Sequence, residues 1–260
     1  MTGKQWEIFC NFKATYADKV AEWTSRVPNL QDLQKEAAKI AKTPDYSFET
    51  PVVYNRSLDE LLPEDDIKLI VIGDNPGKEE QLTCNNRYLV GQAGRIADGF
   101  FKRNPELGIN FRKNVIILNK TPVHSAKTVQ LKNMIKLGGA DMAALLDESQ
   151  VWCAKETAKL HAELCEAGRA EGGVIPELWL VGYSELKKKG IFEKYRDELY
   201  RYYHEEKQNA WDKVFVFQHF SMNRFTIDLS DYSKKNGCDS LSLKEKISSL
   251  GLLHKEEIFN

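Results

Sequence analysis

The chain has 260 residues, of which 42% are hydrophobic and 29% are charged, and its formal net charge is −1. This length allows one large domain or two small ones with a sizeable core, and the near-neutral charge provides no overall basic field for nucleic acid. The sequence contains no apolar run of membrane-spanning length and no signal-peptide h-region at its start. These features predict a globular protein with no membrane partner.

The cysteines are scattered along the chain and form no CxxC pair, which argues against a disulfide framework or a thiolate metal site. Free thiols in a reducing, cytoplasmic compartment are the simplest interpretation. Four histidines lack metal-ligand spacing and are interpreted as structural or exposed; these are His124, His161, His204 and His254. The sequence therefore predicts no metal and no cofactor.

Helical patterns open the chain. Apolar residues recur at three- and four-residue steps through residues 4–44, with an interruption at Pro28, and this spacing predicts two helices. Residues 45–66 read as a connecting stretch with one short helix expected at residues 58–62.

Short apolar runs alternate with helical patterns through the rest of the chain. The runs have the length and β-branched content of strands buried on both faces. They predict strands at residues 67–72, 114–118, 177–181 and 213–218. Helices are expected at residues 95–101, 129–137, 140–170, 184–208 and 241–253.

Four buried strands separated by helices imply right-handed crossovers and a parallel sheet. We predict one α/β domain, a three-layer α/β/α sandwich with a central four-stranded parallel sheet, in which residues 61–260 form the core and residues 1–60 a helical extension. The carboxyl ends of parallel strands share one edge of the sheet, where open α/β sheets bind ligands. The segments expected to converge there are residues 73–77, 119, 182–183 and 219–221.

The turn after the first strand reads Gly73-Asp74-Asn75-Pro76-Gly77. Pro76 fixes its own φ and pushes Asn75 towards an extended conformation, and the glycines allow another backbone or a ligand to come close. The same loop could be a plain strand-to-helix connection.

These segments resemble the motifs of the uracil-DNA glycosylase superfamily. Residues 73–77 resemble its first motif, in the Gly-x-Asn-Pro-Gly form of the mismatch-specific and single-strand-selective branches. Residues 87–94, RYLVGQAG, are similar to the Arg-Pro-Phe-Val-Gly-x-Ala-Gly segment of the iron–sulfur branch. Asn119 stands where the superfamily keeps its base-reading asparagine, and residues 219–222, HFSM, are similar to its His-Pro-Ser-Pro motif. The match spans roughly residues 67–224.

The resemblance implies a monofunctional, metal-independent enzyme that acts as a monomer on DNA containing uracil or a related damaged pyrimidine and hydrolyses the N-glycosidic bond. It implies that Asn75 positions the attacking water and that Asp74 polarises this water or balances the cationic sugar. It also implies that His219 donates a hydrogen bond to the base O2 as negative charge develops there.

The resemblance also implies a base pocket and a DNA contact. Asn119 can pair with the N3–H and O4 of a uracil-like edge, because an amide carries both a donor and an acceptor. The other residues assigned to the base pocket are Gly73, Pro76, Gly77, Tyr88 and Leu89. When a base is extruded from DNA it leaves a gap in the duplex. The residues assigned to fill this gap and to contact the DNA phosphates are Phe220, Ser221, Met222 and Arg224.

Several positions depart from the family pattern. The cysteines of the iron–sulfur branch are missing, so no cluster is predicted. Leu89 stands where that branch stacks a phenylalanine on the base, and either Tyr88 takes over the stack or the pocket is weaker. Phe220 and Met222 replace two prolines. Gly77 stands where the uracil-specific branch has a tyrosine, so a 5-substituted pyrimidine is not sterically excluded.

Each assignment has an alternative. Asn119 could cap a turn, His219 could be a core histidine, and Asp74 could be a solvated loop carboxylate. A nucleophilic Ser221 is disfavoured, because it lies two residues from His219 and has no evident third group. The run of lysines at 187–189 fits a solvated face.

Two other functions remain open. A non-catalytic relative that binds nucleic acid or a free nucleobase is favoured by the near-neutral charge, by Leu89 and by the altered second motif. A nucleotide-processing enzyme could use the same edge of the sheet, although no P-loop or GxGxxG follows any predicted strand.

Overall fold

One parallel sheet of four strands lies at the centre of the computed structural model, which describes residues 1–205 and 209–260. The strands lie side by side in the order β2-β1-β3-β4. Their bounds are β1 (Leu69–Gly73), β2 (Val115–Asn119), β3 (Glu177–Val181) and β4 (Val214–Phe217). Gly73 lies opposite Asn119, and Val181 lies opposite Phe217. The four carboxyl ends therefore share one edge, as predicted.

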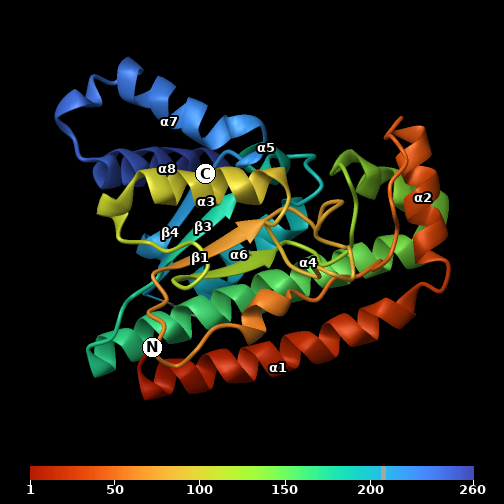
Figure 1. Cartoon of the computed structure of the whole chain (residues 1–260), viewed down its shortest axis with the longest axis horizontal. Coiled ribbons are helices and arrows are strands. Elements are labelled where there is room, and N and C mark those ends of the chain that lie inside the picture. The colour runs from red at the N-terminus through yellow and green to blue at the C-terminus, as the bar shows by residue number, and fades with distance from the viewer. Residues whose placement is uncertain (206–208) are drawn as a thin grey trace.

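Helices cover both faces of the sheet (Figure 1). Alternation along β1 sends Ile70 and Ile72 to one face and Leu69 and Val71 to the other, as a strand buried on both sides requires. The first face packs on α1 (Gly3–Arg26), α2 (Leu30–Ile40), α4 (Val129–Glu171) and α6 (Glu193–Glu205). The second packs on α3 (Gln92–Arg103), α7 (Arg224–Lys235) and α8 (Leu243–Phe259). The predicted three-layer α/β/α fold is confirmed.

The helices differ from the sequence expectation in four places. The break expected near Gly138 is a kink in α4, where Gly139 has φ 59° and ψ −140°. The helix expected at 184–208 is two helices, α5 (Tyr183–Leu186) and α6, and its last residues, 206–208, lie outside the described residues. The short helix expected at 58–62 is a 3₁₀ turn, η1 (Arg56–Asp59). No helix was predicted where α7 lies.

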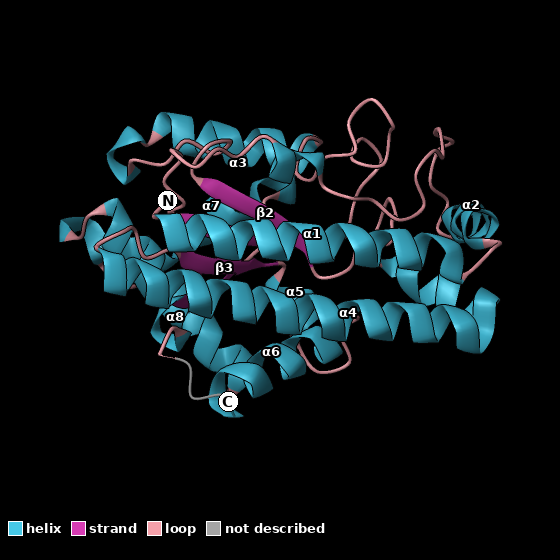
Figure 2. Ribbon diagram, turned by 90° about the horizontal axis from the view of Figure 1, so that it is seen from below, coloured by secondary structure: helices cyan, strands magenta, loops and turns pink. Residues whose placement is uncertain are grey.

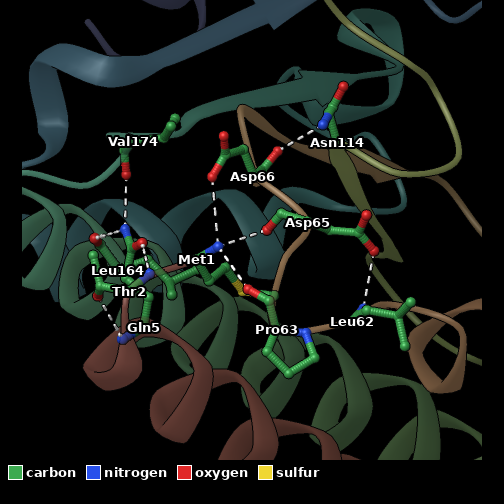
Figure 3. A network of polar contacts seen from close by, with 10 residues as sticks. All are labelled: Met1, Thr2, Gln5, Leu62, Pro63, Asp65, Asp66, Asn114, Leu164 and Val174. Carbon is green, nitrogen blue, oxygen red and sulfur yellow. Dashed lines mark hydrogen bonds and ion pairs between the residues drawn. The ribbon is translucent and has the colours of Figure 1, made fainter.

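The N-terminal helix α1 runs alongside α4 (Figure 2). Its aromatic residues, spaced at helical steps, are buried against the rest of the core; they are Phe9, Phe12, Tyr16 and Trp23. Its first turn is also held by polar contacts (Figure 3). The Met1 ammonium donates to the carbonyls of Pro63 (2.9 Å) and Asp65 (2.8 Å), and Gln5 Nε2 donates to the carbonyls of Leu164 (2.9 Å) and Val174 (2.7 Å). These bonds join the start of α1 to the segments before β1 and β3.

None of the helices in the described part of the chain is both long enough and apolar enough to cross a membrane.

Candidate functional site

The loop after β1 rests on the segment that follows β2. Asn75 Nδ2 donates to the Oγ and the carbonyl of Ser125, both at 2.9 Å, and the Ser125 N–H donates to the Pro76 carbonyl at 3.1 Å. His124 Nδ1 donates to the same Pro76 carbonyl at 2.8 Å, so its Nε2 accepts from the Tyr46 hydroxyl at 3.0 Å. Burial lowers the pKa of His124 to about 4, which keeps the ring neutral. The conformation of Asn75 is thus fixed by the next strand end.

A buried ion pair joins the ends of three strands. Lys120 Nζ lies 2.6 Å from Asp74 Oδ1 and donates to the Val181 carbonyl at 2.6 Å. Burial lowers the pKa of Lys120, and the Asp74 carboxylate opposes this effect. At the end of β3, a Cβ on Gly182 would lie 2.2 Å from Asp74 Oδ1. Only glycine therefore leaves room for the carboxylate at this position.

His219 follows β4 and is held as a neutral ring. The Ser221 backbone N–H donates to Nδ1 at 3.1 Å, and Ser221 Oγ lies 2.8 Å from the same nitrogen. Because Nδ1 accepts, the ring proton is on Nε2. Burial and the positive charge of Lys120 lower the pKa of His219, while Asp74 opposes them. The ring is therefore a neutral hydrogen-bond donor through Nε2.

Asn119 closes β2 and carries an unpaired donor. Its residue is 3% exposed, and among the residues that the structure describes no group pairs with Nδ2. A Cβ at position 73 would lie 2.4 Å from Asn119 Oδ1, so Gly73 is required for the asparagine to occupy this place. A buried amide N–H without an acceptor is rare in native proteins. The void that Asn119 lines with Tyr16 and Trp152 is too small for a water molecule, so a ligand oxygen could pair with Nδ2 only if the surrounding side chains moved.

The Glu80 side chain joins two parts of the loop between β1 and α3, one at Gly77 and the other at Leu89. Its carboxylate accepts from the Gly77 N–H at 3.0 Å and from the Leu89 N–H at 2.9 Å. Arg112 Nη2 donates to the Leu89 carbonyl at 2.5 Å, and Leu89 itself has φ 50°. Burial raises the pKa of Glu80 from about 4.5 to about 7, against the opposing effect of these two N–H groups and of Arg112.

We expect Glu80 to make stability fall as the pH rises. The folded protein holds this proton more tightly than the unfolded chain, so the contribution of Glu80 is full below about pH 4.5 and is lost as the pH passes through about 7. The loss is roughly 3 kcal/mol. In urea unfolding, Glu80→Gln should lack this component of the pH dependence, whereas exposed Glu79→Gln should retain it. Equal pH slopes for the wild type and Glu80→Gln would contradict the raised pKa.

Two aromatic residues assigned to the ligand or to DNA lie in the core. Tyr88 is fully buried, and its hydroxyl bonds to the Tyr16 hydroxyl at 2.7 Å and donates to the Val53 carbonyl at 2.6 Å. Phe220 is also fully buried, with its ring 5.1 Å from that of Phe225. These positions contradict a stacking role for Tyr88 and an intercalating role for Phe220, because both rings are packed inside the core.

The other residues assigned to DNA divide into two groups. Ser221 bonds to His219 Nδ1 through both its hydroxyl and its backbone N–H. Met222 is 66% exposed and Arg224 is exposed, at the start of α7. Met222 and Asn223 both have left-handed backbones, with φ 53° and 56°, which is uncommon for two successive residues other than glycine. This turn projects the Met222 side chain from the edge of the sheet.

Three residues that organise the site could not be identified from the sequence, namely Lys120, Ser125 and Glu80. The sequence offered a signal for Lys120 alone. It is the single lysine in residues 114–126, a run that is otherwise uncharged, and it follows the strand next to the one that precedes Asp74. In the described part of the chain, no group of three or more His, Cys, Asp or Glu side chains is placed to hold a metal ion.

The protein is thus a three-layer α/β/α protein with a parallel sheet. The polar residues Asp74, Asn119 and His219 lie at the carboxyl edge of that sheet. Comparison of the chain with known protein families, with curated proteins and with solved structures gives no match.

Proposed function

We propose that the protein is a monofunctional DNA base-excision glycosylase, which hydrolyses the N-glycosidic bond of uracil or a related damaged pyrimidine without a metal or cofactor and acts as a monomer. The observation that carries the proposal is the buried, unpaired Asn119 Nδ2 at the same edge as Asn75 and His219. An extruded uracil would supply an acceptor for this donor through O4.

We assign the chemistry to three residues. Because Asn75 Nδ2 is held by Ser125 and Pro76, its Oδ1 is the atom left to accept a hydrogen bond from the attacking water. His219 Nε2 would donate to the base O2 as the bond breaks, and a preorganised donor of this kind commonly supplies the largest catalytic contribution. Asp74, paired with Lys120, would act as a fixed negative charge near the cationic sugar rather than as the base.

An oligonucleotide carrying a single deoxyuridine tests the activity. After incubation with the protein, alkali cleaves the strand at any abasic site, and the proposal expects a break at the deoxyuridine. The substrates include single strands, duplexes with matched and mismatched partners, and 5-substituted pyrimidines. If none of them yields a break, the enzymatic proposal is wrong.

Asn119→Asp should move base preference from uracil to cytosine. A carboxylate cannot donate to O4 of uracil but can accept from the exocyclic amine of cytosine. Leaving a polar edge unpaired costs about 1–3 kcal/mol, so uracil excision should slow by about five- to 150-fold while cytosine excision becomes measurable. The matched control is exposed Asn11→Asp on α1. Loss of both activities together in a folded variant would argue against base reading by Asn119.

A second candidate is a non-catalytic relative that binds nucleic acid or a free nucleobase. The core positions of Tyr88 and Phe220 favour it, because they leave no aromatic ring at these two positions to stack on a base or to enter the DNA. Binding through phosphates must weaken steeply as salt increases, whereas capture of a free nucleobase should respond little. Titration of an abasic-analogue duplex and of uracil at several salt concentrations distinguishes the two.

A further inference from the structure

A cavity lies at the opposite edge of the sheet, away from Asn119 and His219. It has a volume of about 320 Å³ and is lined by residues at the amino ends of the strands, including Lys68, just before β1, and Glu177, the first residue of β3. Its other walls come from the segment before β2 and from the first turns of α8.

Six of the ten side chains that line this cavity are hydrophobic, and the other four are polar or charged. Trp179 and Ile247 are each 3% exposed and form its floor. Half-buried aliphatic side chains form its walls; these are Leu107, Ile109, Val174 and Ile175. Small-molecule sites have this combination of apolar walls and a few polar groups, with volumes from about 300 Å³. At about 30 Å³ for each water-sized group, the space suits a ligand of about ten heavy atoms.

The charged groups around the cavity leave an excess of positive charge. Lys68 and Lys244 contribute two ammonium groups, and Glu177 contributes one carboxylate. Glu177 Oε2 already accepts from Trp179 Nε1 at 2.9 Å, and Lys68 Nζ donates to the Gly108 carbonyl at 2.7 Å. Neither lysine forms an ion pair with any carboxylate whose position the structure describes. An anionic group in this cavity would therefore lie near two lysines that have no ionic partner among the described residues, beside the hydrophobic side chains of the lining.

We propose that this cavity binds a small amphipathic monoanion of about ten heavy atoms, with its apolar body against Trp179 and Ile247 and its carboxylate near Lys68 and Lys244. The site is independent of the proposed glycosylase activity, because it uses none of the same residues and lies at the other ends of the strands.

Calorimetric titration with three ten-carbon probes tests the charge preference. Decanoate, decanol and decylammonium share one apolar body and differ in the head group, and each is used below its micelle-forming concentration. We expect one-to-one saturable binding of decanoate, weaker binding of decanol and the weakest binding of decylammonium. Absence of saturable decanoate binding, or equal affinity for decylammonium, would overturn the proposal.

Two variants locate the binding. Lys244→Glu should weaken decanoate binding by about fivefold or more, since it replaces an attraction near the surface by a repulsion, and should strengthen decylammonium binding. Val174→Trp should fill the hollow and abolish binding of all three probes, and its thermal unfolding checks that the protein remains folded. Lys246→Glu makes the same charge change on α8 outside the lining and should leave decanoate affinity unchanged. If Lys244→Glu and folded Val174→Trp both bind decanoate like the wild type, the cavity is not the site.

Discussion

His219→Ala is expected to slow uracil excision by about a hundred- to a thousandfold, the usual loss when one preorganised donor to a developing oxyanion is removed. The expectation rests on the neutral ring, in which Nδ1 accepts from the Ser221 N–H and Nε2 keeps the proton. Single-turnover cleavage of a deoxyuridine oligonucleotide measures the effect on the chemical step. An unchanged rate would remove His219 from the reaction.

Ser221→Ala is the matched control for that experiment. It removes the Oγ contact to Nδ1 but keeps the backbone N–H that fixes the ring, so the rate should fall by no more than about tenfold. The pH profile gives a second readout. Because the pKa of His219 is lowered, the ring is neutral above the ordinary histidine value of about 6.5. The wild-type rate should persist above that pH, whereas a protonated acid would lose activity there.

The strands could be predicted from sequence because burial on both faces leaves a simple signal. In β1 and β2 every residue is buried, and a short apolar run ending at a polar or glycine residue has few other interpretations. Parallel order then follows from the intervening helices. The shared edge of Asp74, Asn119 and His219 is a consequence of that topology, so it could also be predicted.

The helix α7 could not be predicted in the same way. Its buried hydrophobic residues are Phe225 and Leu229, separated by one turn, while Ile227 is exposed. The apolar stripe is therefore too narrow to be distinguished from a polar loop. Similarly, the helix expected at 184–208 is interrupted between the end of α5 at Leu186 and the start of α6 at Glu193. Gly190 lies in this interruption, where a Cβ would lie 2.2 Å from the Glu185 carbonyl oxygen. The close approach of these two backbone segments is visible only in the folded chain.

The core positions of Tyr88 and Phe220 could not be predicted either, and the reason is related. An aromatic residue in a motif can contact a ligand or fill the core, and local sequence does not distinguish the two. Tyr88 bonds to Tyr16, 72 positions away, and Phe220 joins a cluster built around Phe225 on the unpredicted helix. Lys120 is the converse case, because a lysine at a strand end looks solvated until Asp74 is placed beside it.

Lys120→Met should destabilise the protein by about 3–5 kcal/mol, which is the usual cost of removing one partner of a buried ion pair. The Lys120 side chain is fully buried and that of Asp74 is 14% exposed, so the variant leaves a carboxylate with little access to water. The Val181 carbonyl also loses its donor. Urea unfolding at neutral pH measures the change in unfolding free energy.

The matched control is Lys102→Met, which removes a lysine from an ion pair of the same length. Lys102 Nζ lies 2.6 Å from Asp98 Oδ2, but its side chain is 74% exposed, and pairs of this kind contribute at most about 0.5 kcal/mol. If both variants cost the same, burial does not decide the strength of the Lys120 pair. Asp74→Asn combined with Lys120→Met should recover part of the lost stability, because neither charge is then left buried alone. Recovery of stability without recovery of excision would show that the Asp74–Lys120 pair contributes to the reaction as well as to the fold.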